Sequence, residues 1–134
     1  MAGAQKGAGM KVLIVEDDLE QANAYVKALE AHFDSCEVAL TIEDATEKVT
    51  QRQFDLVVLD LFLPDGTSVA LAHQIRLRNA TTAILSVSVA DPTEQVDFYP
   101  YVMSSDHFLR KPVPMGEFTA RACYLASQRR RAPE

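Results

Sequence analysis

The chain of 134 residues has only two cysteines, Cys36 and Cys123, and they lie far apart in the sequence. They match no metal-ligand spacing, and so few thiols in a chain without secretory features indicate a reducing compartment. The first nine residues lack the apolar stretch of a signal peptide. The longest apolar runs, such as residues 83–90 with their serines, are far shorter than a membrane span. We therefore expect a cytoplasmic protein that does not cross a membrane.

An excess of positive charge is also missing. The chain carries 13 Lys and Arg against 19 Asp and Glu, which gives a net charge of −6 and a pI near 5.0. This balance argues against nucleic acid as the main partner of the domain. The basic run at 129–131 could contact an acidic partner, although at the C-terminus of a helix such a run more often complements the helix dipole.

Length and composition predict one globular domain. Hydrophobic residues make up 48% and charged residues 24%, close to the averages for soluble proteins. The chain is long enough to bury a sizeable core, and it contains no internal repeat or linker. We expect a flexible N-terminal tail at 1–9, one domain at 10–131 and a short C-terminal tail at 132–134.

Short apolar runs alternate with segments of helical periodicity along the whole domain. The apolar runs predict strands at 11–15, 35–39, 56–59, 83–87 and 107–109. Apolar residues spaced by three and four predict helices at 19–33, 41–52, 69–79 and 114–129. Asp18 and Thr41 are the expected N-caps of the first two helices, and Pro64-Asp65-Gly66 predicts a loop.

This alternation predicts an α/β fold with a five-stranded parallel sheet and helices on both faces. A fourth helix is expected between the last two strands. Pro100 interrupts its pattern, so we expect this helix to be irregular.

Charged residues follow three of the predicted strands. Glu16 and Asp17 follow the first strand, Asp60 follows the third, and Lys111 follows the fifth. Ligands of open parallel sheets bind at the carboxyl ends of the strands, so these side chains are expected to share one crevice. Carboxylates placed together repel one another unless a cation joins them. The pattern predicts Mg²⁺ held by Asp17 and Asp60, with Glu16 acting through water.

Each of these charged residues, taken alone, can also have an ordinary structural role. The acidic run at 16–18 is, by itself, typical of a helix N-terminus, and Asp18 is expected to serve as that cap. Lys111 by itself could be a surface lysine. Asp60 is harder to dismiss, because a carboxylate directly after four aliphatic residues is costly unless it is paired. The coincidence at three strand ends favours a functional site.

Over residues 10–131 the chain resembles a response-regulator receiver domain of bacterial two-component signalling. The matching segments are Val15-Glu16-Asp17-Asp18, Asp60, Pro64-Asp65-Gly66, Ser88 and Phe108-Leu109-Arg110-Lys111-Pro112. The resemblance implies a flavodoxin-like sheet with strand order 2-1-3-4-5. It also implies that the Lys111-Pro112 bond is cis.

The resemblance assigns roles to individual residues. Asp60 would accept a phosphoryl group as a carboxylate nucleophile. Asp17, Asp60 and the backbone carbonyl of Phe62 would bind Mg²⁺, with Glu16 assisting, and Lys111 would pair with the phosphoryl group. Because Phe62 is bulky and apolar, our hypothesis is that it hinders attack by water and prolongs the phosphorylated state.

Two further residues would form the switch. Ser86 and Ser88 point to the same face of their strand, and Ser88, nearer the carboxyl end, is the expected switch hydroxyl; Ser86 is the alternative. Phe108 occupies the aromatic switch position, although its place in an apolar strand is also explained by core packing. The segment 98–101 departs from the family pattern because it interrupts the fourth helix. That helix usually belongs to the output surface, so we make no prediction for this surface.

The implied function is that of a phosphorelay receiver switched by a histidine kinase or a histidine phosphotransfer protein. It would act on no external substrate. A magnesium-dependent phosphohydrolase of the haloacid-dehalogenase kind is the main alternative, but it needs a second aspartate where Phe62 stands. A degenerate receiver that serves only as a docking module is disfavoured, because the acceptor, the acids, the hydroxyl and the lysine are all present. The output, homodimer formation and the presence of an effector domain remain open.

Overall fold

The computed structural model describes residues 9–91 and 94–130, and for 129 and 130 the backbone alone. The tail predicted at 1–9 lies outside this part of the chain except for Gly9, and the tail predicted at 132–134 lies wholly outside it. Among the described residues, no helix is both long enough and apolar enough to cross a membrane.

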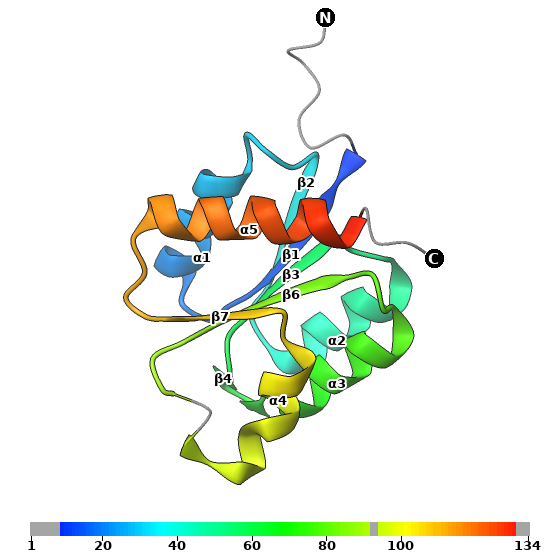
Figure 1. The fold of residues 1–134 in the computed structure, drawn as a ribbon, viewed down its shortest axis with the longest axis vertical. Coiled ribbons are helices and arrows are strands. Elements are labelled where there is room, and N and C mark those ends of the chain that lie inside the picture. The colour runs from blue at the N-terminus through cyan, green and yellow to red at the C-terminus, as the bar shows by residue number, and fades with distance from the viewer. Residues whose placement is uncertain (1–8, 92–93, 131–134) are drawn as a thin grey trace, which may run out of the picture.

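Five parallel strands form the central sheet (Figure 1). They are β1 Lys11–Val15, β2 Ser35–Ala39, β3 Leu56–Leu59, β6 Ala83–Ser88 and β7 His107–Arg110. Their order across the sheet is β2-β1-β3-β6-β7. Counting only these strands along the chain, the order is 2-1-3-4-5, which confirms the expected topology.

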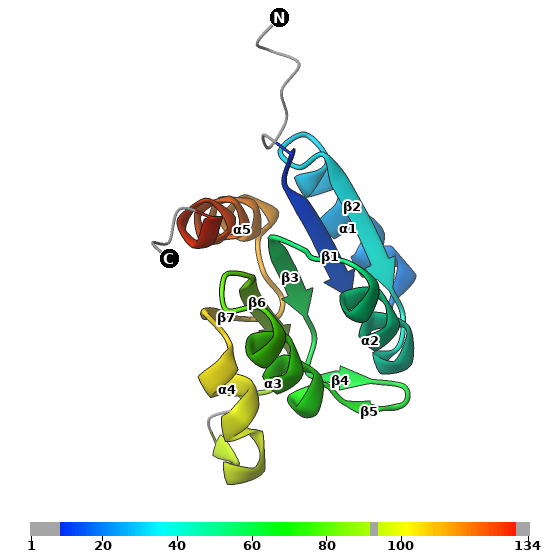
Figure 2. The ribbon, with the colours of Figure 1, turned by 90° about the vertical axis from the view of Figure 1, so that its right-hand side faces the viewer.

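Helices cover both faces of the sheet. They are α1 Leu19–Leu29, α2 Ile42–Gln51, α3 Val69–Arg78, the 3-10 turn η4 Val96–Phe98, α4 Tyr99–Ser104 and α5 Met115–Arg130. Helices α1 and α5 lie on one face, and α2, α3 and α4 lie on the other (Figures 1 and 2).

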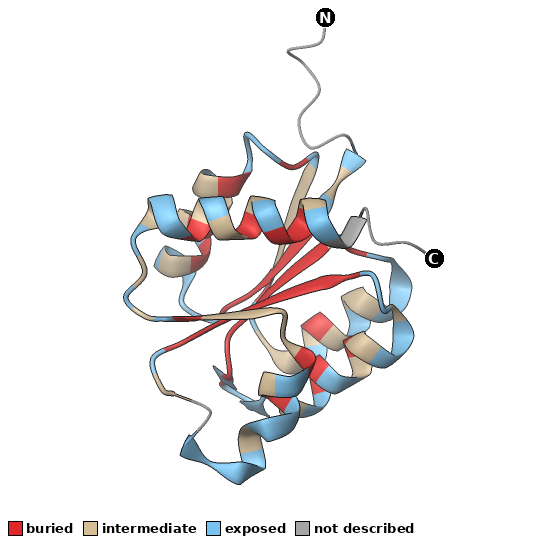
Figure 3. Cartoon of the chain, in the orientation of Figure 1, coloured by how far each residue is buried: buried red, intermediate tan, exposed pale blue. Residues whose placement is uncertain are grey.

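The alternation of side chains along β1 divides the core into two layers. Val12 and Ile14 pack beneath α1 and α5, whereas Leu13 and Val15 pack against the opposite set of helices. The strands are therefore buried on both sides (Figure 3), as expected for a parallel sheet covered by helices. Tyr25 of α1 and Phe118 of α5 stack in the first layer with ring centroids 4.4 Å apart.

The predicted caps are present at the N-termini of α1 and α2. The carboxylate of Asp18 accepts the N–H groups of Glu20 and Gln21. The hydroxyl of Thr41 accepts the N–H of Asp44 at 3.0 Å. These bonds satisfy backbone donors that a helix leaves free in its first turn.

Three local expectations need correction. Pro100 does not interrupt α4 but stands in its first turn, where a missing N–H costs nothing because no helical acceptor is available there. The helix is still short, with the 3-10 turn before it. Helix α1 ends at Leu29, so Phe33 is buried from the following turn instead of from the helix.

The third correction concerns the loop after β3, which contains a small hairpin. Strands β4 Phe62–Leu63 and β5 Gly66–Thr67 pair antiparallel around Pro64 and Asp65. Gly66 has a φ of +136°, a conformation that favours glycine. The turn signal was recognised in the sequence, but two-residue strands are too short to show a pattern.

Candidate functional site

The register of the sheet brings the acidic residues together. Val15 of β1 pairs with Leu59 of β3, so the residues that follow them, Glu16 and Asp60, leave the sheet side by side. The N–H of Asp60 donates to the carbonyl of Val15 at 3.1 Å. The carboxyl edge of two neighbouring strands therefore carries both carboxylates, as the sequence predicted.

Lys111, which directly follows the edge strand β7, reaches this pair with its side chain. Its Nζ donates to Glu16 Oε1 at 2.8 Å and to Asp60 Oδ2 at 3.0 Å. Its backbone N–H donates to the carbonyl of Ser88 at 2.9 Å, and this bond holds the backbone of Lys111 next to the end of β6. The predicted cis bond between Lys111 and Pro112 is confirmed.

These contacts keep the lysine charged. Burial by itself would lower the pKa of Lys111, but the hydrogen bonds and charges of Glu16 and Asp60 outweigh burial and raise it. The side chain of Lys111 is 15% exposed and that of Asp60 is 10% exposed, so solvent screens this contact weakly.

Glu16 is the most enclosed acid of the cluster. Burial raises its pKa, and the hydrogen bond from Lys111 opposes this shift. Its second oxygen, Oε2, accepts the N–H of Asp18 at 3.1 Å. Both oxygens of Glu16 are thus engaged within the protein.

Glu16, Asp17 and Asp60 form a group that could hold a metal ion. Each offers a carboxylate oxygen, and these oxygens lie within 4.8 Å of one another. Mg²⁺ prefers such hard oxygen ligands and takes few carboxylates, keeping water for its other positions. The donor set therefore fits Mg²⁺, with Asp17 exposed and Asp60 at the buried side.

The two candidate hydroxyls have different surroundings. Ser88 is the last residue of β6, is fully buried, and accepts the N–H of Ala90 at 3.4 Å. Ser86 is equally buried but is hydrogen-bonded to the hydroxyl of Ser105, which follows α4. Of the two, Ser88 lies at the carboxyl edge with Lys111.

The two candidate aromatic residues have different neighbours. Phe108, half-buried in β7, lines a cavity of about 230 Å³ together with Tyr101 and Ser105. Phe62 is 42% exposed, and its ring meets that of Phe98 edge-on with centroids 5.8 Å apart.

Two hydroxyls beside the acceptor were missed in the sequence. Ser68, at the N-terminus of α3, donates to the carbonyl of Asp60 at 2.5 Å. Tyr101 of α4 donates to the carbonyl of Leu59 at 2.9 Å. A serine before a helix is ordinarily read as its cap, and a tyrosine in a helix as core, so neither pattern indicated a contact with β3.

Known proteins with similar sequences belong to one family of signalling domains. The family model described as "Response regulator receiver domain" matches residues 12–122. The swarming motility regulation protein RssB of Serratia marcescens is 35% identical over 113 residues, covering 84% of this chain and 51% of that protein. The transcriptional regulatory protein BasR of Escherichia coli is 30% identical over 113 residues, covering 84% and 50%. The chain spans about half the length of these curated relatives.

Solved structures have the same fold. The non-phosphorylated HemR receiver domain from Leptospira biflexa is 31% identical, with a TM-score of 0.76 over 88% of this chain and 94% of that one. A CheY-like receiver domain protein from Methanospirillum hungatei JF-1 superposes with a TM-score of 0.82 over 91% and 97%. At 18% identity it shows the shared fold alone.

Proposed function

Because the chain belongs to the response regulator receiver family, we propose that Asp60 is the phospho-acceptor of a phosphorelay. The observation that carries this proposal is the bond from Lys111 Nζ to Asp60 Oδ2, made at the edge where Glu16 and Asp17 also lie. A partly buried lysine that contacts two of three clustered acids prepares a place for an anionic group.

The reaction follows from the position of the carboxylate. Within the part of the chain that is described, Asp60 Oδ1 has no hydrogen bond, whereas Oδ2 is held by Lys111. An oxygen of Asp60 would attack the phosphorus, forming an O–P bond as the bond from phosphorus to the donor imidazole nitrogen or acyl oxygen breaks. Lys111 would move from the carboxylate to the transferred oxygens and balance their charge.

Magnesium is the proposed cofactor. Asp17 and Asp60 would hold it directly with the Phe62 carbonyl. Glu16, whose oxygens are already engaged, would act through water. When bound, Mg²⁺ would offset negative charge on the phosphoryl oxygens.

The proposed response uses Ser88 and Phe108. The place of Ser88 at the end of β6 supports it as the hydroxyl that meets the phosphoryl group. The bond of Ser86 to Ser105 argues against the alternative. Phe108 borders a cavity toward α4, which would give its ring room to move inward. Phosphorylation would then shift an existing equilibrium between two conformations.

Partners and context follow from the family and stay predictions. A histidine kinase or a histidine phosphotransfer protein would supply the phosphoryl group, in the cytoplasm, and no direct binding of nucleic acid by this domain is expected. The domain would act on no substrate other than itself.

The proposal is tested by incubating the protein with Mg²⁺ and acetyl phosphate and measuring its intact mass. We expect the wild type to gain one phosphate and Asp60→Asn to gain none. A wild type that stays unmodified, or a variant that is still phosphorylated, would overturn the proposal. Sustained release of inorganic phosphate from unrelated phosphate monoesters would favour the phosphohydrolase instead.

A further inference from the structure

A buried tyrosine joins α4 to the strand that carries the acceptor. Tyr101 is 0% exposed, and its Oη donates to the carbonyl of Leu59 at 2.9 Å. Leu59 is the last residue of β3 and directly precedes Asp60. Tyr101 therefore contacts the backbone beside the acceptor without touching its carboxylate.

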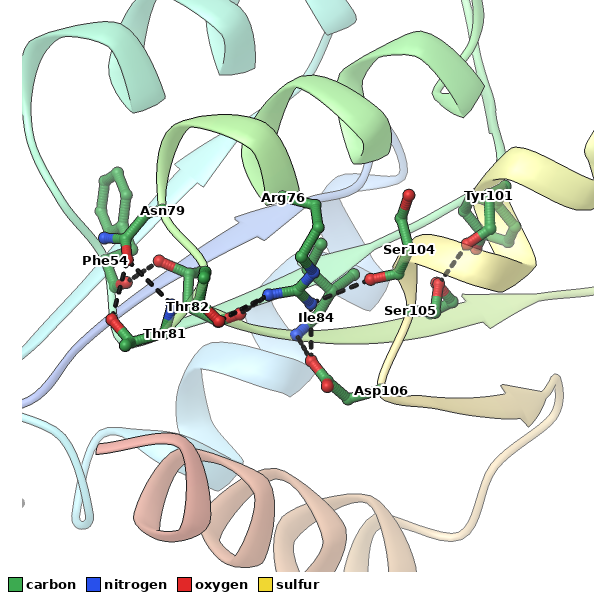
Figure 4. Close-up of polar contacts among 12 residues, drawn as sticks. Phe54, Arg76, Asn79, Thr81, Thr82, Ile84, Tyr101, Ser104, Ser105 and Asp106 are labelled. Carbon is green, nitrogen blue, oxygen red and sulfur yellow. Dashed lines mark hydrogen bonds and ion pairs between the residues drawn. The ribbon is translucent and has the colours of Figure 1, made fainter. Parts of the chain in front are cut away.

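The same helix has a second connection to the sheet at its C-terminus. Ser105 donates from Oγ to the carbonyl of Tyr101 at 2.6 Å (Figure 4). The hydroxyl of Ser105 is also hydrogen-bonded to that of Ser86 on β6. In the register of the sheet, Ser86 pairs with Leu59. Both connections therefore reach the same pair of residues, one on β3 and one on β6.

Burial makes these bonds hard to exchange for bonds to water. Burial raises the pKa of Tyr101, so the phenol stays a neutral donor to the Leu59 carbonyl. If α4 moved away from β3, the hydroxyl and the Leu59 carbonyl would lose a partner in an apolar layer. Unpaired buried polar groups are costly. Helix α4 and the end of β3 are thus constrained to move together.

Helix α4 is held from outside, at its C-terminal end by the bond from Arg76 to the Ser104 carbonyl at 2.9 Å and within the helix by Tyr101. It has only six residues, and its outer side chains Tyr99 and Met103 are 49% and 82% exposed. A helix this short gains little from its own hydrogen bonds. Its position therefore depends on the contacts made by its buried face, of which Tyr101 is the largest member.

We propose that Tyr101 is a positioning residue that couples the phosphorylation state of Asp60 to the position of α4, in parallel with Ser88 and Phe108. This inference rests on the proposed function, because it requires a phosphoryl group on Asp60. A new group on Asp60 shifts the end of β3, and the Leu59–Tyr101 bond passes that shift to α4. A phenylalanine at this position would fill the same space without the bond.

The test compares Tyr101→Phe with Tyr99→Phe, which removes a hydroxyl from the exposed face of the same helix. Hydrogen exchange of residues 99–104 is measured with and without Mg²⁺ and beryllofluoride, a stable mimic of a phosphoryl group on a carboxylate. Phosphate uptake from acetyl phosphate is measured separately by intact mass. We expect beryllofluoride to change the exchange of α4 in the wild type and in Tyr99→Phe. Tyr101→Phe should show at most about half that change while its phosphate uptake stays within about twofold of the wild type.

A second variant keeps the ring and breaks the other connection. Ser105→Ala removes the bond to Ser86, and it should also weaken the response of α4. If Tyr101→Phe does not fold, the same exchange measurement on Ser105→Ala tests the coupling.

The outcomes separate this inference from the proposed function. A full response of α4 in Tyr101→Phe (or in Ser105→Ala where Tyr101→Phe does not fold), or a phosphorylated wild type whose α4 does not respond, would overturn the inference alone. A wild type that takes up no phosphate would overturn both.

Discussion

The ammonium of Lys111 lies 3.0 Å from the carboxylate of Asp60, and both side chains are largely withdrawn from solvent. The same ammonium contacts Glu16 at 2.8 Å. The lysine thus offsets part of the negative charge of the acidic cluster before any other cation binds. A divalent ion at Asp17 and Asp60 would have to share these carboxylates with it.

Replacing Lys111 with methionine should therefore strengthen Mg²⁺ binding while slowing phosphate uptake. Loss of a positive charge beside two carboxylates is expected to tighten Mg²⁺ binding by about five- to tenfold. Phosphate uptake should fall because the transferred oxygens lose their counter-charge. Calorimetric titration with MgCl₂ measures the first effect, and intact mass measures the second. Lys48→Met, which removes a partly exposed ion pair with Asp44, should change neither. Equal Mg²⁺ affinity in Lys111→Met and the wild type would refute the competition.

Phe62 should control how long the phosphoryl group persists. Its ring is partly exposed and meets that of Phe98 edge-on, and we expect it, two residues after the acceptor, to limit the approach of water to the phosphorus. We expect Phe62→Asn to lose its phosphate several-fold faster, and Phe62→Leu, which keeps apolar bulk, to stay close to the wild type. Loss is followed by intact mass after the phosphate donor is removed. An unchanged rate in Phe62→Asn would contradict this role.

Asp65 should make the stability of the domain depend on pH in the acidic range. Its carboxylate accepts the N–H of Ile42 at 2.9 Å and that of Glu43 at 3.0 Å at the N-terminus of α2. These bonds, the one from Ile42 foremost, lower the pKa of Asp65 below its ordinary value of 3.8. A carboxyl whose pKa is lowered by folding stabilises the protein above its unfolded pKa and loses that contribution as pH falls through the folded value.

The wild type should accordingly lose more stability than Asp65→Asn as pH drops below 3.8. Urea unfolding at a series of pH values measures the difference. Asp97→Asn, at an exposed position in η4, corrects for the general effect of removing an acid. Parallel curves for Asp65→Asn and Asp97→Asn would rule out the capping contribution.

Arg76 links α3 to the last residue of α4 and to the segment between α4 and β7 (Figure 4). Its guanidinium donates to the carbonyls of Thr82 at 2.7 Å and Ser104 at 2.9 Å, and to Asp106 Oδ2 at 2.8 Å. The same oxygen of Asp106 accepts the N–H of Ile84 at 2.8 Å. One arginine thereby satisfies acceptors from three parts of the chain.

Arg76→Met should lower the free energy of unfolding by about 2–3 kcal/mol, because it leaves partly buried acceptors without a charged donor. Arg78→Met, two residues further on and exposed, should cost at most about 0.5 kcal/mol. Urea unfolding at neutral pH gives both values. Similar losses in the two variants would show that Arg76 contributes no more than a surface arginine.

The sequence predicted the sheet well because its strands are buried on both faces. Runs such as Leu56–Leu59 are unbroken and apolar, and alternation with helices leaves few arrangements open. The meeting of Glu16 and Asp60 was also predictable, since strands of a parallel sheet end at a common edge. Helix α4 was harder to predict, because a proline is compatible both with the first turn of a helix and with a break inside one.

The contacts of Tyr101 and Arg76 could not be predicted from the sequence. Both depend on where a helix end lies over the sheet, and periodicity gives the buried face of a helix but not the atom that a side chain reaches. Ser86 shows the same limit. Its bond to Ser105 separates it from Ser88 only once β6 and α4 are placed together.

The most direct measurement is the position of the phosphoryl group after reaction with acetyl phosphate and Mg²⁺. Borohydride reduces an aspartyl phosphate to homoserine, and peptide mass spectrometry then identifies the modified residue. The proposed mechanism predicts homoserine at position 60 alone. Homoserine at position 17, or a phosphorylated protein without homoserine at position 60, would contradict it.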